Sequence, residues 1–395
     1  MPIYHQLGTV PRKRHIAFRG KDGRLQPEEL MGNEGFTGPS SLLYHLHQPT
    51  QVRSVRLLKD LEWKPEPEPL LRHRHFRTSQ LEAGPSMVLD RVPLLFNAEV
   101  ALSIAQPQQR DPFFYRNGQG DELVYVSEGA GVLQSPLGEL PFRAGDYLVV
   151  PRGILHQYDF EGGPARCLVI ESTGYIRTPK RYRNEFGQLL EHSPFSERDI
   201  RRPKTLATHD EKGEFRVLVK KDNRLTEMTL AFHPFDVVGW DGYFYPYAFS
   251  IHDFEPIVGR IHQPPPVHQT FQGDGFVICS FCPRPYDFDP EAIPVPYNHS
   301  NVDSDEVLFY ASSEFMSRKG IEYGSITHHP DGLPHGPHPG RAEASIGAKG
   351  TSELAVMMDS FRPLRVAKAA LAFEDANYHK SWLSGQDAPF SPPTT

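Results

Sequence analysis

The chain has 395 residues, 38% of them hydrophobic, and a formal net charge of −7. Such a length can bury a large core in two domains or in one double domain. The acidic balance argues against nucleic acid and anionic membrane surfaces as partners, and no apolar run approaches the roughly 20 residues that span a bilayer. The N-terminus lacks an apolar signal core, so we expect a cytoplasmic location.

Three cysteines are too few for a disulfide framework. Cys279 and Cys282 form a lone CxxC pair, whereas structural zinc usually needs four ligands. We therefore expect reduced core cysteines rather than a metal or redox site.

Residues 1–110 are predicted to be an irregular N-terminal region with a few short strands. His45 and His47 form a His-x-His pair, which could place two ligands on one face of a strand. No partnering carboxylate or third histidine is obvious nearby. A strand with polar partners is the preferred interpretation.

From residue 111 the strand signal is dense. Short runs rich in Val, Leu and Tyr are separated by Gly and Pro turns, at 122–126, 131–134, 147–150 and 167–171. Strands of this length and spacing favour a sandwich or barrel, of which the jelly roll is one form. The first β unit and its connector are assigned to 111–212, with one helix expected at 196–201.

The second β unit is assigned to 213–385. It is predicted to open with a strand pair, 215–221 and 225–232, joined by a turn at 221–224. Residues 386–395 are expected to form a frayed tail.

The second unit contains the candidate metal ligands His299, Glu306 and His335. Two histidines and one carboxylate on one face hold iron(II) and leave its other positions open. Asp305, next to Glu306, is an alternative carboxylate ligand.

This pattern occurs twice in the chain. Residues 115–122 match 299–306 in register, with Asn, Asp and Glu recurring, and 151–156 match 330–335. A repeat on this scale indicates two copies of one β-rich unit.

The first copy is incomplete as a ligand set. It retains Glu122 and His156 but has Tyr115 where the second copy has His299. One metal site per chain is therefore predicted, with a packing or subunit-contact role for the first copy.

Three stretches point to a known family: FHPFDVVGWDG at 232–242, PHGP at 334–337 and NYHK at 377–380. With them, and with His299 and Glu306 in the expected order, the sequence resembles the homogentisate 1,2-dioxygenase family of the cupin superfamily. The resemblance covers most of the chain and is strongest from about residue 232 onward.

The resemblance implies a mainly β, two-repeat cupin (bicupin) of jelly-roll barrels. It implies an Fe(II) enzyme of tyrosine and phenylalanine breakdown that inserts both atoms of O2 into homogentisate and gives maleylacetoacetate. The family's ligands fall on His299, Glu306 and His335. The histidine that takes a proton from the substrate hydroxyl falls on His262, and another near that hydroxyl falls on His329. A homo-oligomer, a trimer or a pair of trimers, is also implied.

Two departures from the family pattern keep alternatives open. The spacing from His299 to Glu306 is one residue longer than in the family. A family tyrosine that contacts the substrate carboxylate is replaced by Phe315, with Tyr310 and Tyr323 nearby as substitutes. Gentisate or another hydroquinone carboxylate is thus an alternative substrate. A metal-free bicupin that binds a ligand is the alternative from another class.

Overall fold

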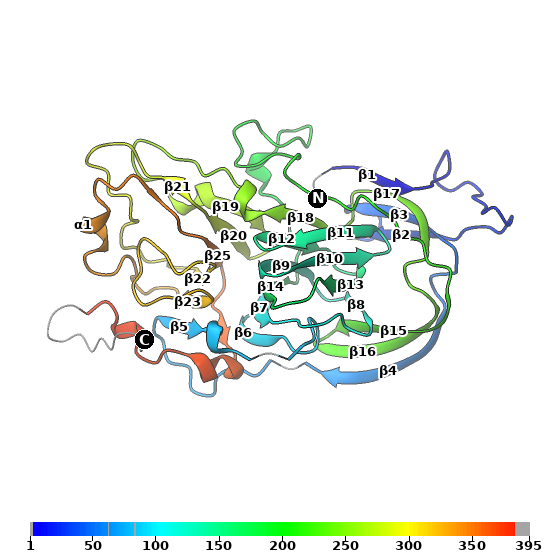
Figure 1. The fold of residues 1–395 in the computed structure, drawn as a ribbon, viewed down its shortest axis with the longest axis horizontal. Helices are drawn as coiled ribbons and strands as arrows, with labels where there is room; N and C mark the ends of the chain where they lie inside the picture. The colour runs from blue at the N-terminus through cyan, green and yellow to red at the C-terminus, as the bar shows by residue number, and fades with distance from the viewer. Residues whose placement is uncertain (1–2, 62, 83, 384–395) are drawn as a thin grey trace.

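The computed structural model describes residues 3–61, 63–82 and 84–383. The fold is mainly β, as the sequence predicted (Figure 1). The described part contains one short α-helix, α1 (Arg341–Ser345), and the 3-10 turns η1 (Thr78–Gln80), η2 (Lys180–Tyr182), η3 (Ile251–Asp253), η4 (Pro265–His268), η5 (Lys368–Phe373) and η6 (Tyr378–Lys380). The predicted tail at 386–395 lies outside the described residues.

Two seven-stranded sheets build the first barrel, on the right of Figure 1. The first runs in the order β11 (Gly138–Arg143), β10 (Ala130–Ser135), β13 (Leu155–Phe160), β8 (Phe114–Asn117), β15 (Lys212–Lys221), β16 (Arg224–Phe232) and β4 (Val52–Asp60). The second runs in the order β18 (Tyr247–Ser250), β12 (Asp146–Val150), β9 (Asp121–Glu128), β14 (Arg166–Ser172), β7 (Val100–Ala105), β6 (Val92–Phe96) and β26 (Arg365–Val366).

A six-stranded sheet forms the main wall of the second barrel, on the left of Figure 1. Its order is β19 (Gln269–Gln272), β20 (Phe276–Phe281), β25 (Ala355–Ser360), β22 (Asp305–Tyr310), β23 (Ser325–His329) and β5 (Arg74–Arg77). A two-stranded pair lies nearby, β21 (Arg284–Pro285) with β24 (Gly350–Thr351). The remaining four-stranded sheet has the order β1 (His5–Gly8), β17 (Val237–Gly242), β3 (Ser40–His45) and β2 (Glu28–Gly32).

The two barrels pack through their sheets. The ring of Tyr125 on β9 lies edge-on to Phe309 on β22, with centroids 6.0 Å apart. The hydroxyl of Tyr147 on β12 lies 2.8 Å from that of Ser280 on β20. These residues are buried, so a single core runs through both repeats.

The predicted strand pair is confirmed by β15 and β16. Asp222 and Asn223 join them with φ of 52° and 54°. Asp and Asn tolerate this left-handed conformation, which a tight hairpin turn requires.

The helix expected at 196–201 is wrong. The Asp199 carboxylate accepts a hydrogen bond from the Ser196 N–H at 2.7 Å and closes a turn there. Aspartate and serine side chains compete with helical backbone bonding in this way.

Strands from several parts of the sequence contribute to each barrel. β6 and β7, from the predicted N-terminal region, lie in the same sheet as β9, and β5 from that region ends the six-stranded sheet. β15 and β16, from the predicted second unit, extend a sheet of the first barrel. The divisions at 110, 212 and 385 stay predictions.

His45 lies between two carboxylates at the edge of β3. Its Nδ1 is 2.7 Å from Asp236 and its Nε2 is 3.1 Å from Glu29. Burial alone lowers the pKa of His45, but the hydrogen bonds to Asp236 and Glu29 outweigh burial and raise the pKa to about 9. His45 thus ends a strand and has polar partners, as preferred above, whereas His47 lies beyond the strand, 2.9 Å from Asp210.

This ion cluster predicts a pH-dependent loss of stability. A histidine whose pKa is raised in the folded state contributes stability that is complete below its unfolded pKa of 6.5 and is lost as pH rises through about 9. We expect the free energy of unfolding, measured with urea, to fall by up to about 3 kcal/mol across this window. His45→Gln should flatten the pH profile. The exposed control His192→Gln should keep the wild-type slope, and an unchanged slope in His45→Gln would contradict the assignment.

Candidate metal centre

His299, Glu306 and His335 come together at one end of the second barrel. Glu306 lies on β22, whereas the two histidines lie on loops that bridge each other through a pair of 2.8 Å backbone hydrogen bonds. One ligand atom from each of the three side chains lies within 4.8 Å of the others. The structure therefore brings the three predicted ligands together.

Both imidazoles are held in the tautomer that a metal needs. Nδ1 of His299 donates to the carbonyl of Tyr297 at 3.2 Å, and Nδ1 of His335 donates to that of Leu333 at 3.1 Å. The unprotonated Nε2 atoms then face Glu306, at 3.6 Å and 3.5 Å. Backbone bonds of this kind orient metal-binding histidines.

The donor set fits a divalent cation. Nε2 of His335 is buried and has no hydrogen-bond partner among the described residues. Burial raises the pKa of Glu306, but the contacts with His299, His329 and His335 outweigh burial and hold that pKa well below its usual value. A buried carboxylate with lone pairs directed at it from two imidazoles calls for a cation between them.

Asp305 is excluded from the cluster by its own contacts. Its carboxylate accepts the backbone N–H groups of Asp331 and Leu364, at 2.8 Å and 2.7 Å, and lies 2.9 Å from Nε2 of His328. Successive side chains of a strand point to opposite faces, so Asp305 and Glu306 cannot both face the histidines.

The first repeat contains the same frame. The Asp121 carboxylate accepts the N–H groups of Arg152 and Ile176, at 2.8 Å and 2.9 Å, as Asp305 does for its two loops. Nδ1 of His156 donates to Ile154 at 2.9 Å, again two residues before the histidine. The repeat read from the sequence thus recurs in these aspartate and histidine contacts.

An arginine neutralises the carboxylate of the first repeat. Arg91 binds both oxygens of Glu122, at 2.8 Å and 2.9 Å, and the Tyr115 hydroxyl donates to Glu122 at 3.0 Å. The guanidinium thus takes the position of the cation, and a tyrosine takes the position of a ligand. Nothing in the spacing of the sequence marks Arg91, which comes from a segment before the repeat.

His329 lies behind Glu306 and is fully buried. Its Nδ1 donates to Glu306 Oε1 at 2.8 Å, and the Tyr378 hydroxyl donates to its Nε2 at 3.4 Å. Burial holds the pKa of His329 well below its usual value, so the ring is neutral. It therefore orients the carboxylate, and it is not among the residues that line the cavity described next.

A narrow cavity of about 60 Å³ opens beside the centre. Besides His299 and Glu306, this inner cavity is lined by apolar groups that include Phe281, Leu308, Phe315, Met316 and Met357, and by His262, His268, Arg284, Arg318 and Glu353. Nε2 of His262 is buried and has no hydrogen-bond partner among the described residues. His262 is thus placed where it could accept a proton from a ligand in the inner cavity.

Neither tyrosine suggested as a substitute at Phe315 lines the inner cavity. The Tyr310 hydroxyl lies 3.0 Å from that of Thr327, and the Tyr323 hydroxyl lies 2.7 Å from that of Ser127 in the first barrel. The expectation that one of them takes the place of the family tyrosine is not supported by this geometry.

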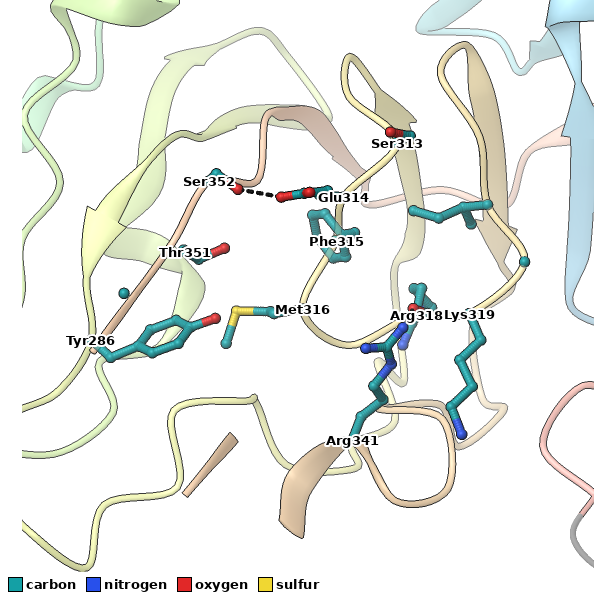
Figure 2. Close-up of a pocket in the computed structure, with 13 residues that line it drawn as sticks. Tyr286, Ser313, Glu314, Phe315, Met316, Arg318, Lys319, Arg341, Thr351 and Ser352 are labelled. Carbon is teal, nitrogen blue, oxygen red and sulfur yellow. Dashed lines mark hydrogen bonds between the residues drawn. The ribbon is translucent and has the colours of Figure 1, made fainter. Parts of the chain in front are cut away.

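A second, wider cavity of about 390 Å³ shares Phe315 and Met316 with the inner cavity, and Figure 2 shows its lining. This outer cavity is lined by Tyr286, residues 313–316, residues 318–321, Arg341 and residues 350–352. Phe315, Met316 and Arg318 line both cavities and form the wall between them. Sequence reasoning missed Arg318 because it belongs to no motif.

The CxxC cysteines are ordinary core residues. Cys279 and Cys282 are buried and free, and burial raises the pKa of both thiols. Among the described residues, no helix is both long and apolar enough to cross a membrane.

Comparisons with known proteins point to a family of dioxygenases. The family model described as homogentisate 1,2-dioxygenase N-terminal matches residues 97–251. A protein of Saccharolobus solfataricus named "putative dioxygenase" is 42% identical over 97% of this chain and 100% of its own length. The homogentisate 1,2-dioxygenase of Rhodopseudomonas palustris is 25% identical over 71% of this chain and 65% of its own length.

Solved structures give a more distant likeness. A cupin 2 conserved barrel domain protein from Leptotrichia buccalis is 9% identical, with a TM-score of 0.35, and covers 74% of this chain and 98% of its own.

The ligand geometry predicts that His335→Ala abolishes stoichiometric iron binding, because it removes a buried nitrogen that faces Glu306. Iron content after anaerobic loading, measured by atomic absorption, checks this. His156→Ala is the matched control: it removes the equivalent ring of the first repeat and should leave the iron content unchanged. Full iron in His335→Ala, or its loss from a folded His156→Ala, would show that the ligands lie elsewhere.

Proposed function

We propose that this chain, which belongs to the homogentisate 1,2-dioxygenase family of the cupin superfamily, is an iron(II)-dependent, ring-cleaving dioxygenase that inserts both atoms of O2 into homogentisate to give maleylacetoacetate. The observation that carries the proposal is the cluster of His299, Glu306 and His335 beside a mostly apolar cavity. Three ligands on one side leave room for two further molecules.

His299, Glu306 and His335 would hold iron(II), which would supply binding and electron transfer for the substrate hydroxyl and O2. The protein's own part is to hold these groups. Tyr378 and His329 form a hydrogen-bonded chain that fixes the Glu306 carboxylate. Such outer contacts set how firmly a ligand holds its metal.

The inner cavity orients the aromatic ring. Leu308 and Met357 line it with apolar groups and exclude water from the substrate ring. His262 accepts the proton of the substrate hydroxyl at its Nε2, which has no other partner among the described residues. Burial lowers the pKa of His262, so the ring is neutral and able to accept that proton near pH 7.

A related hydroquinone carboxylate such as gentisate is the second candidate substrate. Phe315 favours it, since this apolar side chain lines the inner cavity where the family's carboxylate-binding tyrosine is expected. A phenyl ring cannot donate a hydrogen bond to a carboxylate.

Oxygen consumption by the iron-loaded protein tests the function. We expect consumption of one O2 per homogentisate, with the absorbance of a ring-opened product, and a slower reaction with gentisate. Faster turnover of gentisate would select the second candidate. Absence of O2 uptake with any hydroquinone, despite bound iron, would reject the dioxygenase.

His262→Gln should keep iron while slowing turnover by about 10²- to 10⁴-fold, because general base catalysis is lost. Iron content and kcat measured on the same preparation separate the two effects. The control is His252→Gln on η3, an exposed histidine that lines neither cavity. An unchanged kcat in His262→Gln would remove this residue from the reaction.

A further inference from the structure

Arg318 is a buried cation without an anionic partner. Only 5% of the residue is exposed, and no carboxylate among the described residues lies within ion-pair distance of it. Its Nη1 donates to the carbonyl of Gly336, its Nε has no partner, and its guanidinium lies 5.6 Å from the centre of the Trp382 ring. Buried charges are normally paired; Glu306 attracts the Arg318 guanidinium across the cavity, but no carboxylate of the described residues forms an ion pair with it.

Two other arginines, Arg74 and Arg284, do have carboxylate partners. Arg74 binds Glu66 and Glu374, and Arg284 binds Glu353 at 2.7 Å. Arg284 also lines the inner cavity, but its charge is already balanced there by Glu353. The unbalanced guanidinium of the inner cavity is therefore that of Arg318.

Arg166 shows that burial without a carboxylate is not enough for a site. Like Arg318, it donates Nη1 to a backbone carbonyl, that of Thr78, and lies over an aromatic ring, that of Tyr323 at 5.9 Å. Arg166 lines neither the inner nor the outer cavity. The location of Arg318, beside the candidate ligands, is what distinguishes the two.

Arg318 lies in the wall between the two cavities and lines both of them. It lines the inner cavity with His299 and Glu306, and the outer cavity with Lys319 and Arg341 (Figure 2). The carboxylate in the outer cavity, that of Glu314, accepts a hydrogen bond from Ser352. Positive charge thus predominates on the outer side, and a small anion can approach Arg318 from there.

We propose that Arg318 is the specificity-determining residue that binds the carboxylate of the aromatic substrate. It does so in place of a tyrosine hydroxyl, which Phe315 lacks. The planar guanidinium offers several N–H donors to a carboxylate, whereas the apolar side chains of the inner cavity hold the ring with its hydroxyl toward His299 and Glu306. This inference rests on the proposed function, and it names an aromatic acid with a carboxylate on the side opposite the reacting hydroxyl as the substrate class.

The test compares an anion with an uncharged analogue of the same shape. Homogentisate and its amide, 2,5-dihydroxyphenylacetamide, are compared by kcat and KM on iron-loaded protein. In parallel, 3-hydroxyphenylacetate and 3-hydroxyphenylacetamide are titrated calorimetrically into iron-free protein, which needs no turnover. The variants are Arg318→Met and Arg318→Lys, with Arg166→Met as the matched control.

We expect the wild type to favour the acid over the amide by about 10- to 100-fold in KM and in Kd, as charge-assisted hydrogen bonds imply. Arg318→Met should bring the ratio close to one by weakening binding of the acid, Arg318→Lys should leave an intermediate ratio, and Arg166→Met should keep the wild-type ratio. A general loss of structure would affect acid and amide alike and would not change the ratio.

The inference is overturned if the wild type shows no preference for the acid, or if Arg318→Met keeps the preference. If Arg318→Met does not fold, the acid-to-amide ratios of the wild type and of Arg318→Lys test the inference instead. A wild-type ratio in Arg318→Lys would then overturn the inference. Absence of O2 uptake together with an Arg318-dependent preference in iron-free protein would reject the proposed function and keep this inference. Turnover of homogentisate with a wild-type ratio in Arg318→Met would keep the proposed function and reject this inference.

Discussion

The hydrogen bonds of the Asp305 carboxylate determine the geometry of the site. By accepting two backbone N–H groups from separate loops, Asp305 joins β22 to both of them and leaves the next residue to face inward. Asp121 makes the same two bonds in the first barrel, where Glu122 is the residue that faces inward. A carboxylate that accepts buried backbone N–H groups satisfies donors that would otherwise be unpaired. In each barrel, the hydrogen bonds of an aspartate thus position the glutamate that follows it in the sequence.

Given this shared frame, the two barrels differ in the cation that balances the inward carboxylate. In the second barrel two imidazoles complete a set that fits a metal ion. In the first, Arg91 forms a two-point ion pair with Glu122, and Tyr115 donates to the same carboxylate. A buried carboxylate needs either a metal ion or a basic side chain as its counter-charge, because an unpaired charge in a core is strongly unfavourable. The fold therefore tolerates loss of the metal from one repeat only with a substitute charge.

Sequence patterns predicted what depends on local order: a β fold, a repeat and its register, and the three residues that cluster. They wrongly predicted a helix at 196–201, where Asp199 closes a turn instead. The choice between Asp305 and Glu306 needed the strand's orientation, which the one extra residue obscured. Arg91 and Arg318 follow no motif, and their importance arises from burial beside particular carboxylates or cavities. Long-range packing of this kind is absent from spacing and composition.

Arg91 has a consequence for the supply of cofactor. An arginine is synthesised with the chain, so the acidic group of the first barrel has its counter-ion as soon as that barrel forms. The second barrel must obtain its counter-ion from solution, and a bound ion stabilises the native state in proportion to the logarithm of its free concentration. With iron as the proposed ion, its scarcity in a cell would therefore weaken one half of the molecule while leaving the charge balance of the other half intact.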